Sequence, residues 1–288
     1  MKVAKNTFLV QVDAAKKSTL DIVGINGQKI VIDVDYNKYK HSVQIGKVYA
    51  GPIQITSEFL YDTILNIGDT VVFHHLVCEP KNKMFDGVYR CDYFNIFAKI
   101  DNDMIEPIED LVFVDPIKEA EEDLFCGAVM VRNTSGNVKQ RGKVFALSNK
   151  ARQFGIEAGD IVHFTKNADY EMKLVDKILY RMRVRNIICV ERNGLLVCPS
   201  DKICVMRTAD FKLDKFKEAQ EHHQLRGEVI GVGEKLNGVV CQEDSVDFFA
   251  PIDGCIRQAG TEYYFVEPRH INYIHGTKSE TGIGSGAN

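Results

Sequence analysis

The chain has 288 residues, so it is too long for one small barrel and long enough for two or three compact domains. Because 45% of the residues are hydrophobic, each of these domains can bury a core. Its 36 Lys and Arg residues are nearly balanced by 40 Asp and Glu residues, which gives a net charge of −4 and no overall basic field to hold a polyanion. We therefore expect no nucleic-acid partner.

Eight cysteines are scattered along the chain without a Cys-x-x-Cys pair, and most lie inside apolar runs. This usage is typical of buried, reduced thiols, so we expect synthesis in a reducing, cytoplasmic compartment. No apolar run approaches the length that crosses a bilayer, and the amino terminus carries no signal-peptide pattern. We expect no membrane partner.

The first predicted elements are a strand over residues 7–12 and a hairpin over residues 19–34. In the hairpin, two β-prone runs flank Asn26-Gly27, which is the strongest two-residue signal for a hairpin turn. Because this turn fixes the pairing of its flanking strands, we expect an ordered hairpin here.

A strand–connection–strand pattern then occurs three times. Residues 141–147 read Arg-Gly-Lys-Val-Phe-Ala-Leu and lead into Gly-Asp-Ile-Val-His-Phe at 159–164. Residues 46–51 and 68–73 repeat both parts, and residues 226–232 and 244–249 repeat them more loosely. Similarity at this spacing indicates repeated small domains and not a solenoid.

Three further segments predict how each module closes. Residues 95–114, 186–205 and 255–274 each read as strand, turn and strand, followed by a proline and another apolar strand. Pro107, Pro199 and Pro268 match in this comparison. We accordingly expect the opening strand of the second module at 127–131, followed by a short connection.

The predicted fold is all-β, with three tandem antiparallel barrels, an extra N-terminal β-hairpin and a short helical or irregular linker. The expected domains are module 1 at 1–116 with the hairpin 19–34 inserted, module 2 at 117–206, a divergent module 3 at 207–276, and a flexible or partner-ordered tail at 277–288.

These glycine-centred motifs together resemble the GroES-like co-chaperonin family, most closely at residues 141–164. The resemblance implies small GroES-like β-barrels and non-enzymatic, ring-shaped lids for chaperonins, in which neighbouring barrels pair a first strand with a last strand. It also implies a mobile loop that carries a short aliphatic tripeptide to the chaperonin.

The candidate partner-binding residues are the aliphatic side chains of the predicted hairpin: Ile22, Ile25, Ile30, Val31, Ile32 and Val34. Ile30 to Ile32 form the only aliphatic triplet that we place at the loop position. In module 2 we assign that position to residues 132–140, which have no such triplet, and in module 3 the apolar residues there are Phe211, Leu213 and Phe216.

Catalytic and metal sites have weaker signals. His74 and His75 are adjacent, and no Cys or carboxylate spacing completes a zinc set around them. No Ser/His/Asp signature is present, and the cysteines resemble one another in their apolar settings. We predict no enzyme activity, no cofactor and no metal.

Two interpretations of function follow. The one we favour from sequence is a structural or auxiliary component of a large assembly, such as a phage capsid or virion, which acts through contacts with further copies or with capsid-type lattice proteins. The alternative is a co-chaperonin, phage-encoded in one version, whose partner is a chaperonin. The protein would be cytoplasmic at synthesis, and located in the virion if the first interpretation holds.

Overall fold

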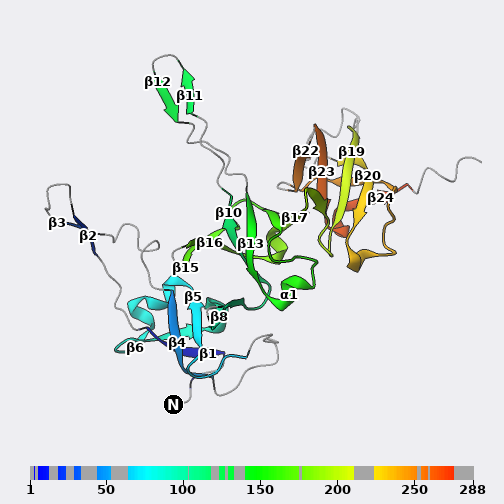
Figure 1. The fold of residues 1–288 in the computed structure, drawn as a ribbon. Coiled ribbons are helices and arrows are strands. Elements are labelled where there is room, and N and C mark those ends of the chain that lie inside the picture. The colour runs from blue at the N-terminus through cyan, green and yellow to red at the C-terminus, as the bar shows by residue number, and fades with distance from the viewer. Residues whose placement is uncertain are drawn as a thin grey trace, which may run out of the picture. The chain divides into compact units, whose positions relative to one another are not determined.

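The computed structural model describes residues 3, 6–12, 19–23, 29–33, 44–52, 64–102, 104–117, 123–126, 129–132, 140–174, 177–210, 224–251, 254–258 and 260–275. These residues form an all-β protein with three antiparallel sheets of six or seven strands and two separate two-stranded hairpins (Figure 1). The α-helix α1 (Asn149–Arg152) and several short 3-10 helices connect the strands.

The first sheet has the strand order β6-β7-β1-β4-β5-β8-β9. Its strands are β1 (Thr7–Gln11), β4 (Ile45–Ala50), β5 (Thr70–Phe73), β6 (Lys83–Phe85), β7 (Val88–Asp92), β8 (Ile96–Asp101) and β9 (Met104–Pro107). The 3-10 helices η2 (His75–Cys78), η3 (Pro80–Asn82) and η4 (Tyr93–Asn95) lie between them in the chain.

The second sheet repeats this order as β15-β16-β10-β13-β14-β17-β18. Its strands are β10 (Leu111–Pro116), β13 (Arg141–Leu147), β14 (Ile161–Phe164), β15 (Tyr170–Leu174), β16 (Lys177–Arg183), β17 (Ile187–Arg192) and β18 (Leu195–Val197), with the 3-10 helix η5 (Val184–Asn186) before β17.

The third sheet has the order β22-β23-β19-β20-β21-β24, one strand shorter. Its strands are β19 (Ile203–Asp210), β20 (Gln224–Val232), β21 (Ser245–Phe249), β22 (Cys255–Gln258), β23 (Thr261–Val266) and β24 (Ile271–Ile274), with the 3-10 helices η7 (Glu234–Leu236) and η8 (Pro268–His270).

The repeated motif has the same register in all three sheets. Its glycine lies opposite a fully buried valine of the next strand, and the three pairs are Gly46↔Val71, Gly142↔Val162 and Gly227↔Val246. The expectation of three repeated β modules is confirmed. The motif is a packing element in the first and third sheets, because a Cβ atom would lie 2.5 Å from Gln11 at Gly46 and 2.4 Å from Val205 at Gly227, both on the first strand of the module.

The closing segments require a correction. Residues 111–116 and 203–210 are not final strands of the preceding module, because they are β10 and β19, interior strands of the second and third sheets. Of the strand expected at 127–131, the described residues 129–131 belong to none of the three large sheets. Pro268 begins η8, which precedes β24 as η4 and η5 precede β8 and β17, so it is not the counterpart of Pro107 and Pro199.

The chain divides into two compact units, and strands of the second sheet contribute to both. One unit comprises Met1–Asp115, Phe145–Ala151 and Asp169–Met182; the other comprises Pro116–Val144, Arg152–Ala168 and Arg183–Asn288. In the first unit, Phe73, Phe97 and Phe113 are fully buried in one apolar cluster. In the second, Val246 and Phe248 belong to the core of the third sheet.

Candidate functional site

The hairpin expected near the N-terminus is present as β2 (Thr19–Val23) paired antiparallel with β3 (Lys29–Asp33). It forms a two-stranded sheet of its own, separate from the first sheet (Figure 1). Leu20 lies opposite Ile32, and Ile22 lies opposite Ile30. Since alternate residues of a strand share a face, these four aliphatic positions lie on one face of the ribbon.

The candidate partner-binding residues divide accordingly. Ile22, Ile30 and Ile32 lie at paired positions on the apolar face, and Val31 lies on the other face, opposite Asp21. Ile25 and Val34 lie outside the described residues, as does the Asn26-Gly27 turn. The strand pairing confirms the predicted hairpin, whereas the role of its residues in binding is not tested by the structure.

A second hairpin occupies the same place in the second module, and the sequence interpretation missed it. Strands β11 (Asp123–Cys126) and β12 (Val129–Arg132) pair antiparallel between β10 and β13, as β2 and β3 do between β1 and β4. Leu124 lies opposite Val131, and Cys126 lies opposite Val129.

The outgoing strand of this hairpin therefore carries an aliphatic triplet, Val129-Met130-Val131, where β3 carries Ile30-Val31-Ile32. The sequence prediction of an opening strand at 127–131 places the loop position at residues 132–140, which is wrong. The shared signal is an aliphatic triplet placed between the first strand of the module and the strand of its glycine motif. In the third module the position is residues 211–223, which include Phe211, Leu213 and Phe216 and lie outside the described residues.

A polar and aromatic cluster lies in the first unit around Tyr170. Its hydroxyl group accepts hydrogen bonds from Gln44 Nε2 at 3.0 Å and from the backbone N–H of His75 at 3.2 Å, and it also contacts His75 Nδ1. The Arg181 guanidinium lies over the rings of Phe97, at 4.3 Å, and of Tyr170, at 5.0 Å. These contacts hold the β15–β16 ribbon against the first sheet.

His74 belongs to the same cluster. Its ring lies 4.8 Å from the ring of Tyr170, and its Nδ1 accepts a hydrogen bond from the backbone N–H of Leu76. Burial lowers the pKa of His74, and the nearby Arg181 lowers it further. No group of three or more His, Cys, Asp or Glu side chains among the described residues could hold a metal ion.

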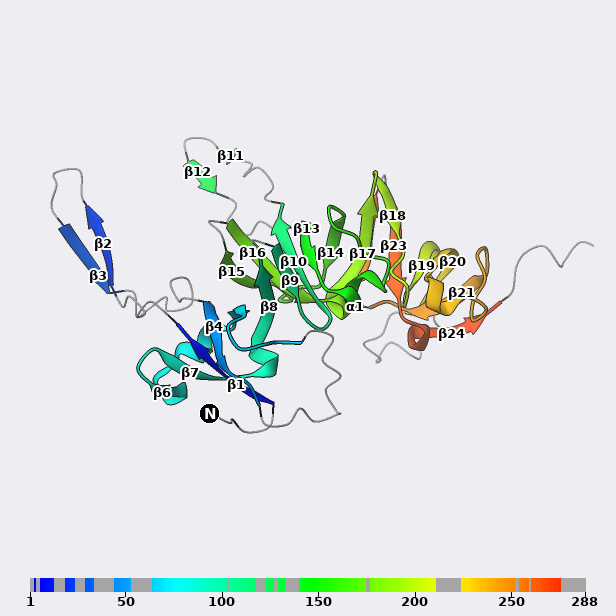
Figure 2. The same ribbon diagram turned by 60° about the horizontal axis from the view of Figure 1, so that its bottom comes forward.

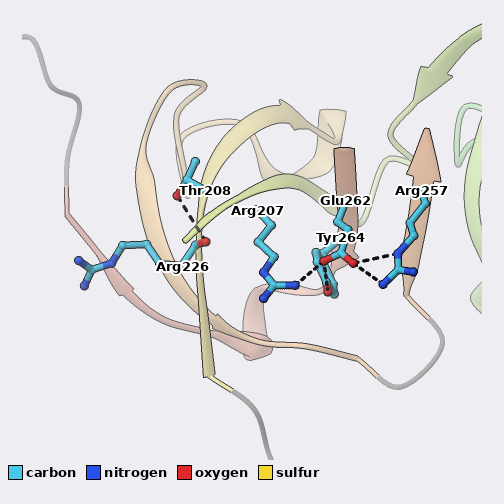
Figure 3. Close-up of polar contacts among 6 residues, drawn as sticks. All are labelled: Arg207, Thr208, Arg226, Arg257, Glu262 and Tyr264. Atoms are coloured by element: carbon cyan, nitrogen blue, oxygen red, sulfur yellow. Dashed lines mark hydrogen bonds and ion pairs between the residues drawn. The ribbon is translucent and has the colours of Figure 1, made fainter. Parts of the chain in front are cut away.

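Three neighbouring strands of the third sheet, β19, β22 and β23, carry a charged network (Figure 3). Glu262 on β23 accepts hydrogen bonds from Arg207 at 2.5 Å, from Arg257 at 2.6 and 2.9 Å, and from the Tyr264 hydroxyl group at 3.2 Å. The hydrogen bonds from Arg207 and then Arg257 lower the pKa of Glu262 to about 2. Because one carboxylate meets two cations, the network ties β19, β22 and β23 together.

The cysteines that the structure describes are free thiols. Burial raises the pKa of Cys189 and of Cys204, and it raises the pKa of Cys198 to about 12. Such thiols are poor nucleophiles because little thiolate forms at neutral pH. Among the described residues, no helix is long and apolar enough to cross a membrane.

Comparison with known proteins assigns the second module. Residues 104–191 match the family model of the chaperonin 10 kDa subunit, Cpn10, so this part of the chain is a Cpn10 domain. The match begins at β9 and ends in β17, and it includes the β11–β12 hairpin. A search of curated proteins finds no match to the chain.

Proposed function

From the Cpn10 domain at residues 104–191, we propose that this protein is a non-enzymatic co-chaperonin, which binds a chaperonin through its β2–β3 and β11–β12 hairpins. The observation that carries the proposal is the shared position of the two hairpins. Each is inserted between the first strand of a module and the strand of the glycine motif, and each has an aliphatic triplet on its outgoing strand.

This position is where the GroES-like resemblance places the chaperonin-binding loop. A paired hairpin presents its aliphatic residues with part of the backbone entropy already lost, which lowers the cost of ordering a loop on binding. Two hairpins in one chain also raise the overall affinity, since the second binding event becomes intramolecular when both can reach the same chaperonin.

The second hairpin also changes the balance between the two interpretations of function. The sequence interpretation favours a structural component of a virion, because it finds no repeated docking loop in the second and third modules. With Val129-Met130-Val131 at that position and a Cpn10 match over the same module, the co-chaperonin interpretation is better supported.

The test measures binding of the purified chain to a purified chaperonin in the presence of ATP, by biolayer interferometry. Ile30→Asp and Val131→Asp each place a charge at a paired aliphatic position of one hairpin. We expect each single variant to weaken binding and the double variant to reduce it at least tenfold beyond either one. Lys29→Ser, in the same β3 strand, is the matched control and should bind as the unmodified chain does.

Absence of binding by the unmodified chain would overturn the proposal, as would a double variant that binds equally well. Circular dichroism of the variants separates lost binding from lost folding, because neither hairpin is part of the three large sheets.

A further inference from the structure

The β15–β16 ribbon of the second sheet packs against β8 of the first sheet, and both lie in the first compact unit (Figure 2). Met172 and Leu179 of the ribbon are buried in one apolar cluster with Phe97 of β8. The β22–β23 ribbon of the third sheet makes the matching contact in the second unit, where Phe265 packs with Ile188 of β17. We refer to these contacts as the first and the second joint.

The ribbons carry different residues at the same positions of the two joints. Arg181 and Phe265 each lie three residues before a 3-10 helix, η5 and η8. Arg181 pairs with Tyr170 across the first ribbon, and Phe265 donates its backbone N–H to Gly254 at 2.9 Å at the equivalent place of the second. Phe265 is 3% exposed, so an apolar side chain closes the second joint. At the first joint this position carries a cation, with a phenol group opposite it.

The sheet side of the first joint differs in a similar way. His74 and Thr165 each follow the last residue of their strands, β5 and β14, and they donate their backbone N–H to the last residue of η4 and of η5, at 2.7 and 2.9 Å. The first joint therefore has His74 and His75 where the second has Thr165 and the exposed Lys166. Threonine and lysine keep their charge between pH 5 and 8, whereas histidine does not.

His74, His75 and Arg181 gather around the ring of Tyr170. The centroid of the Tyr170 ring lies 4.8 Å from that of His74, 5.6 Å from that of His75 and 5.0 Å from the Arg181 guanidinium. The two histidine rings are 4.2 Å apart. Three groups that carry or can take up a positive charge therefore lie together in a part-buried site.

Charged and titratable groups face the histidine pair from both sides of the joint. Tyr170 on β15 and Arg181 on β16 face it from the ribbon, and Glu79 faces it from the end of η2. Burial lowers the pKa of His74, Arg181 lowers it further, and Glu79 acts in the opposite sense with a smaller effect. Glu79 is also ion-paired with Lys81 at 2.7 Å. Protonation of both histidines would thus place three positive charges against one carboxylate.

We infer that the first joint is a pH-sensitive latch, which loosens when His74 and His75 are protonated, while the second joint stays closed. In the neutral state Nδ1 of His75 accepts the hydroxyl proton of Tyr170, and Nδ1 of His74 accepts the backbone N–H of Leu76. A proton on either Nδ1 turns that acceptor into a donor, so the hydrogen bond is lost. It also adds a positive charge beside Arg181, which weakens the contact between the ribbon and the first sheet.

Opening of this joint would leave the second sheet intact. β16 would stay paired with β10, whereas Met172, Leu174 and Leu179 would move away from Phe97 of β8. Acidification would therefore loosen the first module from the second at one defined contact. The second joint has no histidine at the matching positions, which makes it an internal reference for the first.

Hydrogen exchange of the full chain, measured by mass spectrometry at pH 7.5 and at pH 5.5, tests the latch. After correction for the intrinsic pH dependence of exchange, the amides of β15 and β16 should exchange faster at pH 5.5, by about tenfold for each histidine coupled to opening. The factor is about ten because a histidine with an ordinary pKa of about 6.5 is mostly protonated at pH 5.5 when the joint is open. The amides of β22 and β23, in the same sample, should keep their rate.

The His74→Asn/His75→Gln double variant should lose most of this pH dependence, whereas His163→Gln should keep it. His163 is the matched control because it is a half-buried histidine on β14, in the second unit. Equal acceleration in the two ribbons would overturn the inference, and so would an unaltered response of the double variant.

Arg181→Met keeps both histidines and removes the fixed positive charge beside them, so its acceleration at pH 5.5 should be smaller than that of the unmodified chain. An equal acceleration would contradict the latch, and this variant decides the question if circular dichroism at pH 7.5 shows the double variant to be unfolded. No chaperonin is present in these measurements, so their outcome is separate from that of the binding test.

Discussion

The hydroxyl group of Tyr170 is hydrogen-bonded to Nδ1 of His75, which connects β15 to the 3-10 helix η2 that follows β5. The hydroxyl oxygen already accepts two N–H groups, from Gln44 and from the His75 backbone. Its own proton is therefore directed at the histidine, so Nδ1 is the acceptor and the neutral ring carries its proton on Nε2. One phenol group satisfies three polar groups of the first unit.

Tyr170→Phe should lower the free energy of unfolding by about 1–3 kcal/mol, because the donors of Gln44 and His75 would lose their partner in a part-buried site. Urea denaturation at pH 7.5 measures this loss. Tyr49→Phe is the control, since Tyr49 is 43% exposed and its ring, not its hydroxyl group, contacts Phe85. Equal effects of the two substitutions would contradict the assigned network.

Acidification should destabilise the protein through His74. Burial and Arg181 lower the pKa of His74 in the folded state, so the unfolded chain binds the proton more tightly. The contribution to stability is complete above the unfolded value of about 6.5, and it is lost as the pH falls from there toward the lowered folded value. Protonation of Nδ1 would also break the hydrogen bond that it accepts from the Leu76 N–H.

The measurement is the urea midpoint at pH 7.5 and at pH 5.5, compared with that of His74→Asn, whose side-chain oxygen can still accept the Leu76 N–H. We expect a smaller drop for the variant. A smaller drop in the urea midpoint should remain in the variant, because burial and Arg141 also lower the pKa of His163. A variant with an unchanged pH dependence would exclude His74 as a source.

The repeat motif predicted the fold well because its glycines and buried valines are local consequences of strand packing. Gly46, Gly142 and Gly227 lie at the same register position in three sheets, and each is followed two residues later by a valine. The Asn26-Gly27 turn likewise predicted β2 and β3, because turn chemistry acts between adjacent residues.

The module limits were harder to predict because a strand can pair with one module and belong to another. β9 and β18 each close one sheet and lead into the next, so the sequence pattern wrongly assigns the apolar strands after them to the preceding module. That error moved the expected opening of the second module to 127–131 and concealed the β11–β12 hairpin. β10 and β19 pair instead with strands that come later in the chain, and such long-range pairing leaves no periodic pattern in the sequence.

Glu262→Gln should reduce the stability of the third sheet at pH 7, because Arg207 and Arg257 would lose the carboxylate that they share. The pKa of Glu262 is lowered to about 2, so its contribution is present above the unfolded value of about 4.3 and is lost as the pH falls through the folded value. The difference between the variant and the unmodified chain should therefore shrink between pH 5 and pH 2. Thermal melts monitored by circular dichroism test this, with Glu234→Gln on η7 as the control.

Gly227→Ala should destabilise the third sheet, whereas Gly231→Ala in the same strand should not. A Cβ atom on Gly227 would lie 2.4 Å from Val205 Cγ1 and 2.5 Å from the backbone oxygen of Met206, so the β19–β20 pair would have to move. Overpacking of this kind typically costs about 1–3 kcal/mol.

At Gly231 the nearest atoms to such a Cβ are those of Cys204 and Cys198, at 3.5 and 3.7 Å, which is ordinary contact. Alanine there should leave the free energy of unfolding unchanged or raise it by up to about 1 kcal/mol, because glycine loses more backbone entropy on folding than alanine does. Chemical denaturation of both variants compares the two sites within one strand. If both were equally stable, the motif glycine would not be required by strand packing. We expect Gly46→Ala to destabilise the first sheet as Gly227→Ala destabilises the third, because its Cβ atom would lie 2.5 Å from the backbone oxygen of Gln11.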